Sequence, residues 1–221
     1  MSSMPNVKTI NFGTNSLAHI STLTMNGLNE LYDFSIGEGV MTSVDEIAIG
    51  SNSLNALPSF NFTGFTNVTN IHIGNNSMNV VTTVLASGLN KLKKIEIGFN
   101  SLNQVSSLSL SNMPKLNSFT SGMNSLSQSQ AFIASNNPLL QQIHIGDHSF
   151  QLSSSFHLNE LPKINLLEIG SNCFKGSEKQ SQQPSSSSLS FVLSDFDELR
   201  TVKLSSDSFA HFKSIKMSER I

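Results

Sequence analysis

Residues 92–102 read Leu92-Lys-Lys-Ile95-Glu-Ile97-Gly98-Phe-Asn100-Ser-Leu102. In this frame apolar residues fill the first, fourth, sixth and eleventh places, glycine the seventh and asparagine the ninth. Ile95 and Ile97 alternate with polar neighbours, which is the pattern of a short strand with one buried face. The frame therefore predicts a strand that buries both isoleucines and points Glu96 outward.

The same frame recurs along the chain, mostly in steps of 24 residues. It begins at Val7, Val44, Val68, Leu92, Leu116, Leu140, Ile164 and Leu199, with a further match from Leu31. A second alternating apolar pair follows in each unit: Phe60 and Phe62, Val84 and Ala86, Leu108 and Leu110, Phe156 and Leu158, Phe191 and Leu193. Repeats of this kind stack as coils, so the chain is predicted to carry two parallel sheets on opposite walls of a solenoid.

This frame resembles the signature of the leucine-rich repeat family, LxxLxLxxNxL in units of roughly 20–29 residues. The resemblance covers nearly the whole chain and is closest to the arrays of unicellular eukaryotes and to the BspA-like type, although their recurring cysteine is absent. It implies a mainly β, right-handed solenoid with one sheet on the concave face and a short-strand sheet on the opposite wall. We expect one solenoid over residues 1–221, with about eight or nine coils.

Two columns of residues mark the end of each predicted strand. The glycine column falls at residues 13, 37, 50, 74, 98, 122, 146 and 170, and predicts either an unusual backbone dihedral or a close approach of backbones. The resemblance implies that the asparagine column is a ladder turned inward to satisfy backbone groups. Its members are Asn15, Asn52, Asn76, Asn100, Asn124 and Asn172.

The repeat is interrupted in two places. The interval from Gly37 to Gly50 is too short for a complete coil, so residues 31–50 form either a strand followed by a bulge or part of one long coil. The interval from Gly170 to Ser205 is longer than the others, and its extra sequence contains KGSEKQSQQPSSSS. This polar segment predicts a flexible loop at 175–188.

Composition limits the class of function. Charged residues make up only 13%, and the formal net charge is -2, so nothing predicts binding to nucleic acid. A single cysteine, Cys173, excludes an internal disulfide. The chain has no signal peptide pattern and no apolar run of roughly 20 residues, which predicts a cytoplasmic protein as written, or a cell-surface one if it is a fragment of a longer protein.

The sequence predicts no catalytic, cofactor or metal site. It lacks GxSxG, a Gly-rich phosphate loop, HExxH and CxxC. His72 and His144 share the outward column of the first sheet, but three coils separate them by about 14 Å. One zinc ion cannot bridge that distance.

We expect a protein partner to bind the outward side of the first-sheet strands. The predicted outward column is Asn11, Ala48, His72, Glu96, Thr120, His144, Glu168 and Lys203. Beside it, Phe99 and Met123 are apolar where most copies are polar, which makes them the candidate anchor. The predicted partner-binding residues are therefore Phe99, Met123, His72, Glu96, Thr120, His144 and Glu168.

The function predicted from these features is a non-enzymatic protein-binding or scaffolding module. The alternative is a structural repeat segment of a larger multidomain or cell-surface adhesion protein whose activity lies outside these residues. Polar capping units are absent at both ends, and apolar residues such as Phe212, Ile215 and Met217 lie near one of them. Such ends favour end-to-end self-association.

Overall fold

The computed structural model describes residues 4, 6–37, 40–62, 65–86, 88–176, 190–194, 196–210, 212 and 214–218. Residues 177–188, which form most of the predicted flexible loop, lie outside the described residues. Within the described part, the regular secondary structure consists of short β-strands, and it includes no helix.

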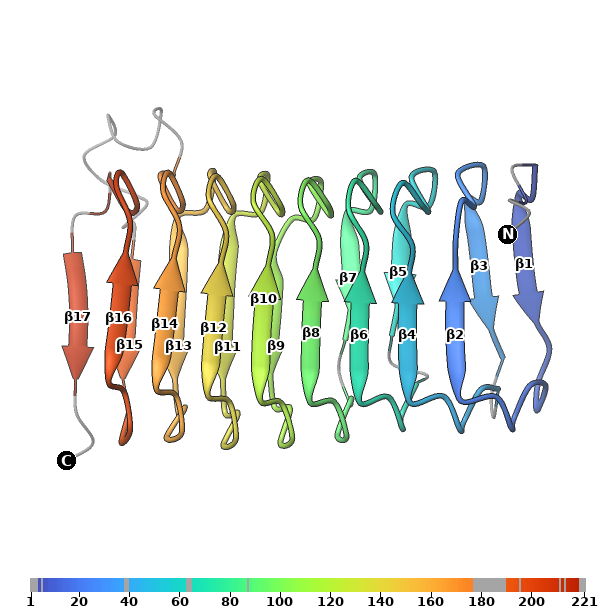
Figure 1. The fold of residues 1–221 in the computed structure, drawn as a ribbon, viewed down its shortest axis with the longest axis horizontal. Helices are drawn as coiled ribbons and strands as arrows, with labels where there is room; N and C mark the ends of the chain where they lie inside the picture. Colours follow the sequence, from blue (N-terminus) through green and yellow to red (C-terminus); the bar gives the residue numbers. More distant parts are fainter. Residues whose placement is uncertain are drawn as a thin grey trace.

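The first sheet has eight parallel strands (Figure 1). Phe119 lies directly opposite Ile95 on one side and Ile143 on the other, so each repeat adds one strand in the same register. The strands are β2 (Thr22–Met25), β4 (Glu46–Ile49), β6 (Asn70–Ile73), β8 (Lys94–Ile97), β10 (Ser118–Ser121), β12 (Gln142–Ile145), β14 (Leu166–Ile169) and β16 (Thr201–Leu204).

The opposite wall, here called the second wall, carries the remaining strands in three parallel sheets (Figure 1). One pair is β1 (Thr9–Phe12) with β3 (Asp33–Ile36), and another is β5 (Ser59–Asn61) with β7 (Thr83–Leu85). The third sheet contains β9 (Leu108–Ser111), β11 (Ala131–Ser135), β13 (Ser155–Asn159), β15 (Ser190–Ser194) and β17 (Ser214–Ser218). The predicted two-walled parallel solenoid is confirmed.

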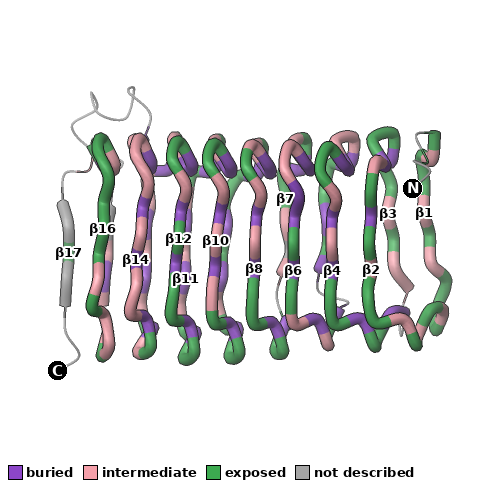
Figure 2. The backbone as a smooth tube through the Cα atoms, in the orientation of Figure 1, coloured by how far each residue is buried: buried purple, intermediate pink, exposed green. Residues whose placement is uncertain are grey.

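Apolar side chains from both walls form one continuous interior cluster, and Figure 2 shows buried segments, in purple, in successive coils along the solenoid. Phe132 stacks on Phe156 along the second wall with ring centroids 5.6 Å apart, and its ring lies 5.4 Å from that of Phe119 in the first sheet. Phe150 and Phe174 of the turns form a second stack with centroids 5.1 Å apart, which packs edge-on against Phe132 and Phe156. Each such ring, when fully buried, contributes on the order of 1.5–3 kcal/mol, so the interior accounts for much of the stability.

The turn after each repeat frame uses two residues in the left-handed region. In the repeat of β8, Asn100 has φ 53° and Leu102 has φ 56°. Asparagine tolerates this conformation better than most residues, which explains its column. The predicted asparagine ladder is present as side-chain hydrogen bonds: Asn100 Nδ2 donates to Asn76 Oδ1 at 2.9 Å, and Asn124 Nδ2 donates to Asn100 Oδ1 at 3.2 Å.

A second asparagine column, which the sequence analysis did not identify, bonds to the backbone of the neighbouring coil. Asn55 Oδ1 accepts the N–H of Asn79 at 3.0 Å, and Asn79 Oδ1 accepts the N–H of Asn103 at 3.3 Å. Asn79 Nδ2 also donates to the Asn100 carbonyl oxygen at 3.0 Å. These residues perform the backbone bonding that had been expected of the first column.

The buried ladder of the turn consists of serines. Ser101 Oγ donates to the Gly74 carbonyl oxygen at 2.8 Å and accepts the N–H of Ser77 at 3.1 Å. Equivalent pairs of bonds are made by Ser77, Ser125 and Ser149. Cys173 takes this place in one repeat, where its thiol lies 3.2 Å from the Gly146 carbonyl oxygen and burial raises its pKa to about 12.

The glycine column allows the backbones of adjacent coils to approach each other. A Cβ atom on Gly146 would lie 2.5 Å from the backbone nitrogen of Met123 and 2.6 Å from the carbonyl carbon of Gly122. Gly146 does not have positive φ. Of the two alternatives left open by the sequence, close approach is therefore the correct one.

The first two repeats differ from the others in the wall that carries the repeat frame. The frames that begin at Val7 and Leu31 form β1 and β3, which pair with each other on the second wall. The intervening segment forms β2, which pairs with β4 in the first sheet, Leu23 opposite Ile47. From β4 onward, all the frames lie in the first sheet.

This change of wall explains the short interval between Gly37 and Gly50. Elsewhere, two strands that carry the repeat frame are separated by a strand that does not carry it. Here β3 and β4 both carry the frame and are consecutive, so they lie on opposite walls and no bulge is needed. The second-wall sheet is interrupted between β3 and β5, but Phe34 and Phe60 stack across the interruption with centroids 5.4 Å apart.

Candidate functional site

The outward column of the first sheet is fixed by strand register. It runs through Thr24, Ala48, His72, Glu96, Thr120, His144, Glu168 and Lys203. The prediction that Asn11 begins this column is wrong, because β1 belongs to the second wall and Thr24 takes the place. Asn15 is separated from the other ladder asparagines for the same reason, since it follows β1.

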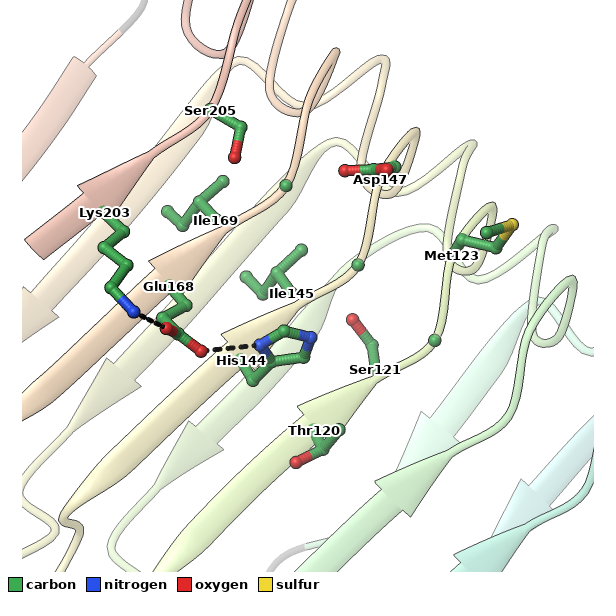
Figure 3. A pocket seen from close by; sticks show the side chains of 13 residues that line it. Thr120, Ser121, Met123, His144, Ile145, Asp147, Glu168, Ile169, Lys203 and Ser205 are labelled. Carbon is green, nitrogen blue, oxygen red and sulfur yellow. Dashed lines mark hydrogen bonds and ion pairs between the residues drawn. The ribbon is translucent and has the colours of Figure 1, made fainter.

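Charged side chains pair between neighbouring strands of this column. His144 Nδ1 lies 3.2 Å from Glu168 Oε2, and Lys203 Nζ donates to Glu168 Oε1 at 2.5 Å (Figure 3). The hydrogen bonds from Lys203 and then His144 lower the pKa of Glu168. A second pair is wider, with His72 Nδ1 3.8 Å from Glu96 Oε2.

Phe99 and Met123 occupy the place directly after the column glycine on two adjacent coils, and they are 46% and 58% exposed. In other coils a polar side chain at this place accepts a backbone N–H from the next coil. Asn75 Oδ1 accepts the N–H of Phe99 at 3.0 Å, and Asp147 Oδ1 accepts that of Ser171 at 2.7 Å. Phe99 and Met123 cannot do so, and no acceptor for the N–H of Met123 or Asp147 is found among the described residues.

A hollow of about 480 Å³ lies beside Met123, at the ends of strands β10, β12, β14 and β16 (Figure 3). Ser121 lines it at the strand position held by Ile145 in β12, and the Ser121 hydroxyl is buried without a hydrogen-bond partner in the described part of the chain. The lining residues are Thr120, Ser121, Gly122, Met123, His144, Ile145, Gly146, Asp147, Glu168, Ile169, Gly170, Lys203 and Ser205.

The structure gathers some of the predicted site residues and separates others. Thr120, Met123, His144 and Glu168 line the hollow. His72, Glu96 and Phe99 lie outside it, on the preceding coils of the same face. Their role in binding stays a prediction.

The lining residues that were absent from the predicted partner-binding set include Asp147 and Ser121. Asp147 takes the polar place after the glycine, and its carboxylate follows Phe99 and Met123 in the same column. Ser121 replaces the isoleucine of the frame. The replacement at Ser121 is a break in an otherwise apolar column, and that signal could have identified it.

Among the described residues, no group of three or more His, Cys, Asp or Glu side chains is placed to hold a metal ion. A search of the same residues for an apolar helix of membrane-spanning length found none.

Part of the chain is similar to a known protein family. Residues 42–102 match a family model described as leucine rich repeat. Comparisons with curated proteins and with solved structures found no match. The family match carries no subtype, so the resemblance to the BspA-like type stays a prediction.

Proposed function

We propose that this chain, in which residues 42–102 match the leucine-rich repeat family, is a non-enzymatic scaffold that binds a protein partner on the face of its first sheet. Repeat solenoids generally use their extended sheet surface for protein interaction. The particular surface proposed here is the hollow at the ends of β10 to β16 together with Phe99 and the charged column beside it.

The interruption of the acceptor ladder at Phe99 and Met123 carries this proposal. A polar residue at either place would accept a backbone N–H from the next coil, as Asn75 and Asp147 do. Phe99 and Met123 make no such hydrogen bond, and their large apolar side chains are exposed to solvent on adjacent coils. A break in a local rule without a structural gain is typical of a functional surface.

The charges beside the anchor favour a partner that is apolar at its centre and polar around it. Glu168 is already paired with Lys203 and His144, so these groups line the hollow as a fixed network. Such a network orients a partner more than it adds affinity. We therefore assign the affinity to Phe99 and Met123 and the orientation to the charged column.

Affinity capture with purified wild-type chain and the double variant Phe99→Ser, Met123→Ser tests the proposal. Serine suits this place, because Ser51 holds it in another coil and accepts the N–H of Asn75 at 3.2 Å. The matched control is Val80→Ser, Leu152→Ser, which removes two exposed apolar side chains from other turns. Captured proteins are identified by mass spectrometry, and direct binding is then measured by calorimetry with the purified partner.

We expect at least one partner to be retained by wild type and control and lost by the double variant, with a drop in affinity of at least tenfold. Equal retention of every partner by all three proteins would remove Phe99 and Met123 as the anchor. Circular dichroism and thermal melting of each variant establish that the fold is intact.

We also propose that the chain associates with itself through the ends of the solenoid. At one end Val202 and Leu204 of β16 are 39% and 42% exposed, although the equivalent Leu167 and Ile169 of β14 are buried. An increase of the sedimentation coefficient with protein concentration, measured by sedimentation velocity, supports this second function. A monomer at every concentration contradicts it.

A further inference from the structure

The N-terminal end of the solenoid is as open as the C-terminal end. Ile10 and Phe12 of β1 and Leu23 of β2 occupy inward strand positions but are only partly buried, and they line a hollow of about 310 Å³. Leu17 is 41% exposed, whereas its counterparts Leu54 and Leu102 in later turns are buried. Each end thus presents apolar side chains in the pattern of an interior layer.

Both ends terminate on the same wall. The described chain starts with β1 on the second wall and finishes with β17 on the second wall (Figure 1). A copy that is only translated along the axis would place β1 beyond β17 and leave no first-sheet strand between them. A copy that is also rotated by half a turn about the axis exchanges its walls, and strands then alternate between walls without omission.

We infer that two copies stack head to tail with a half-turn between them, β1 of one copy adding to β16 of the other and β2 adding to β17. This inference rests on the proposed self-association and specifies its geometry. All strands stay parallel in this arrangement, because a half-turn about the solenoid axis reverses strand direction and exchanges the walls together.

The turn sequences identify a second copy as the occupant. β1 is followed by Asn15 and Leu17 at φ 58° and 54°, and β16 is followed by Asp207 and Phe209 at φ 59° and 56°. The half-turn places these like turns next to each other, so the repeat frame continues on one wall across the junction. Within the chain, the frame strands change walls: β1 and β3 lie on the second wall, and β4 and the later frame strands lie in the first sheet. A copy rotated by half a turn places its β1 in line with the first sheet of its neighbour, so frame strand follows frame strand at the junction.

In the register inferred for β16 and β1 of the next copy, apolar residues face each other and few charged residues do. Val202 and Leu204 would face Ile10 and Phe12 of the next copy, and Lys203 would face Asn11. Strand β1 carries no charge along its length, and a free uncharged edge is a template for pairing. Arg200 and Lys8 would oppose each other at the start of the strands, so added salt should strengthen the association.

Pairwise disulfide trapping tests the register in a Cys173→Ser background. Parallel neighbours lie about 4.8 Å apart, which falls within the Cα separation that a disulfide spans. A mixture of Asn11→Cys and Lys203→Cys chains should give a cross-linked dimer under mild oxidation. The matched control mixture, Thr24→Cys with Lys203→Cys, should not, because β2 adds to β17 and not to β16 in the half-turn arrangement.

The outcomes separate this inference from the proposed self-association. Cross-linking of the Thr24 mixture instead of the Asn11 mixture, or in neither mixture while wild type still associates, overturns the half-turn geometry alone. Absence of association in wild type overturns both. Because single-cysteine chains can also dimerise by themselves, each is oxidised alone, and equal yield alone and in mixture also counts against the inference.

A second experiment does not depend on oxidation. Val202→Lys, Leu204→Lys blocks one end and Leu23→Lys blocks the other, and lysine at both ends avoids a new attraction between them. Each variant alone should be monomeric in sedimentation velocity, and their mixture should stop at a one-to-one dimer. Growth of either variant alone, to the extent seen in wild type, would exclude head-to-tail stacking.

Discussion

At the scale of single residues, Met123 exchanges a hydrogen bond for an exposed apolar side chain. In Met123→Asn the new Oδ1 should accept the N–H of Asp147, as Asn75 Oδ1 accepts that of Phe99. We expect the free energy of unfolding to rise by about 0.5–1 kcal/mol, measured by urea denaturation. Met123→Leu, which offers no acceptor, is the control and should match wild type.

This prediction connects stability to function. If Met123 anchors a partner, the asparagine variant should be more stable and bind more weakly, which is the common trade-off at functional surfaces. Equal stability of the asparagine and leucine variants would show that water already satisfies the Asp147 N–H as well as a side chain can.

Glu168 gives a prediction for pH. Hydrogen bonds from Lys203 and His144 lower its pKa in the folded chain, so the folded value lies below the unfolded one. The stabilisation from this group is therefore complete above the unfolded pKa and is lost as pH falls through the folded pKa. In Lys203→Met, NMR titration of the side-chain carboxyl should show the pKa of Glu168 shifted upward toward its ordinary value.

A smaller upward shift is expected for His144→Gln, because His144 is the weaker of the two causes. An unchanged titration in both variants would mean that the pairs are not maintained in solution. That outcome would also weaken the view that this network orients a partner.

At the scale of strands and turns, the glycine column sets the distance between coils. A Cβ on Gly146 would meet backbone atoms of the preceding coil at 2.5 and 2.6 Å, whereas a Cβ on Gly13 would meet nothing within 4 Å. Gly146→Ala should therefore lower the free energy of unfolding by about 1–3 kcal/mol. Gly13→Ala is the matched control and should leave thermal and urea denaturation unchanged.

The sequence was sufficient for most of the fold because alternating residues such as Ile95 and Ile97 set the strand face and a regular step sets the stacking. It failed at β2, where Asn26 replaces the column glycine and conceals the strand of Leu23 and Met25. The frame specifies a strand and the turn after it, but not the wall on which they lie. The frame that begins at Val7 was consequently expected in the first sheet, whereas its strand lies on the second wall.

The candidate site was harder to predict than the fold. The outward column followed from alternation, apart from Asn11. The hollow could not be predicted from alternation, because its shape depends on how the turns lie over the strand ends. Asp147 could be recognised only once those turns were placed.

At the scale of the whole molecule, each coil contacts only its neighbours, so stability should vary along the solenoid. Central coils have packed layers on both sides, whereas β2 and β16 have a neighbouring first-sheet strand on one side only. The exposed inward residues Val202 and Leu204 reflect this difference. In such arrays local opening begins at the ends.

Hydrogen–deuterium exchange measured by mass spectrometry can resolve this gradient. We expect the amides of β8, β10 and β12 to be the most protected, and those of β1, β2 and β16 to exchange fastest among the strands. Uniform protection from end to end would instead indicate that the solenoid opens as one cooperative unit, with inter-coil contacts too strong for separate opening of the ends.

The concentration dependence of the same measurement adds a test of the assembled state. If the ends stack, protection at β1, β2 and β16 should rise with protein concentration while that of β10 stays constant, because only the terminal layers gain a neighbour. Val202→Lys, Leu204→Lys should abolish the concentration dependence at β16 and leave the central gradient unchanged. A rise of equal size in every strand would point to general stabilisation by contacts elsewhere on the surface, and the open ends would then be ordinary frayed coils.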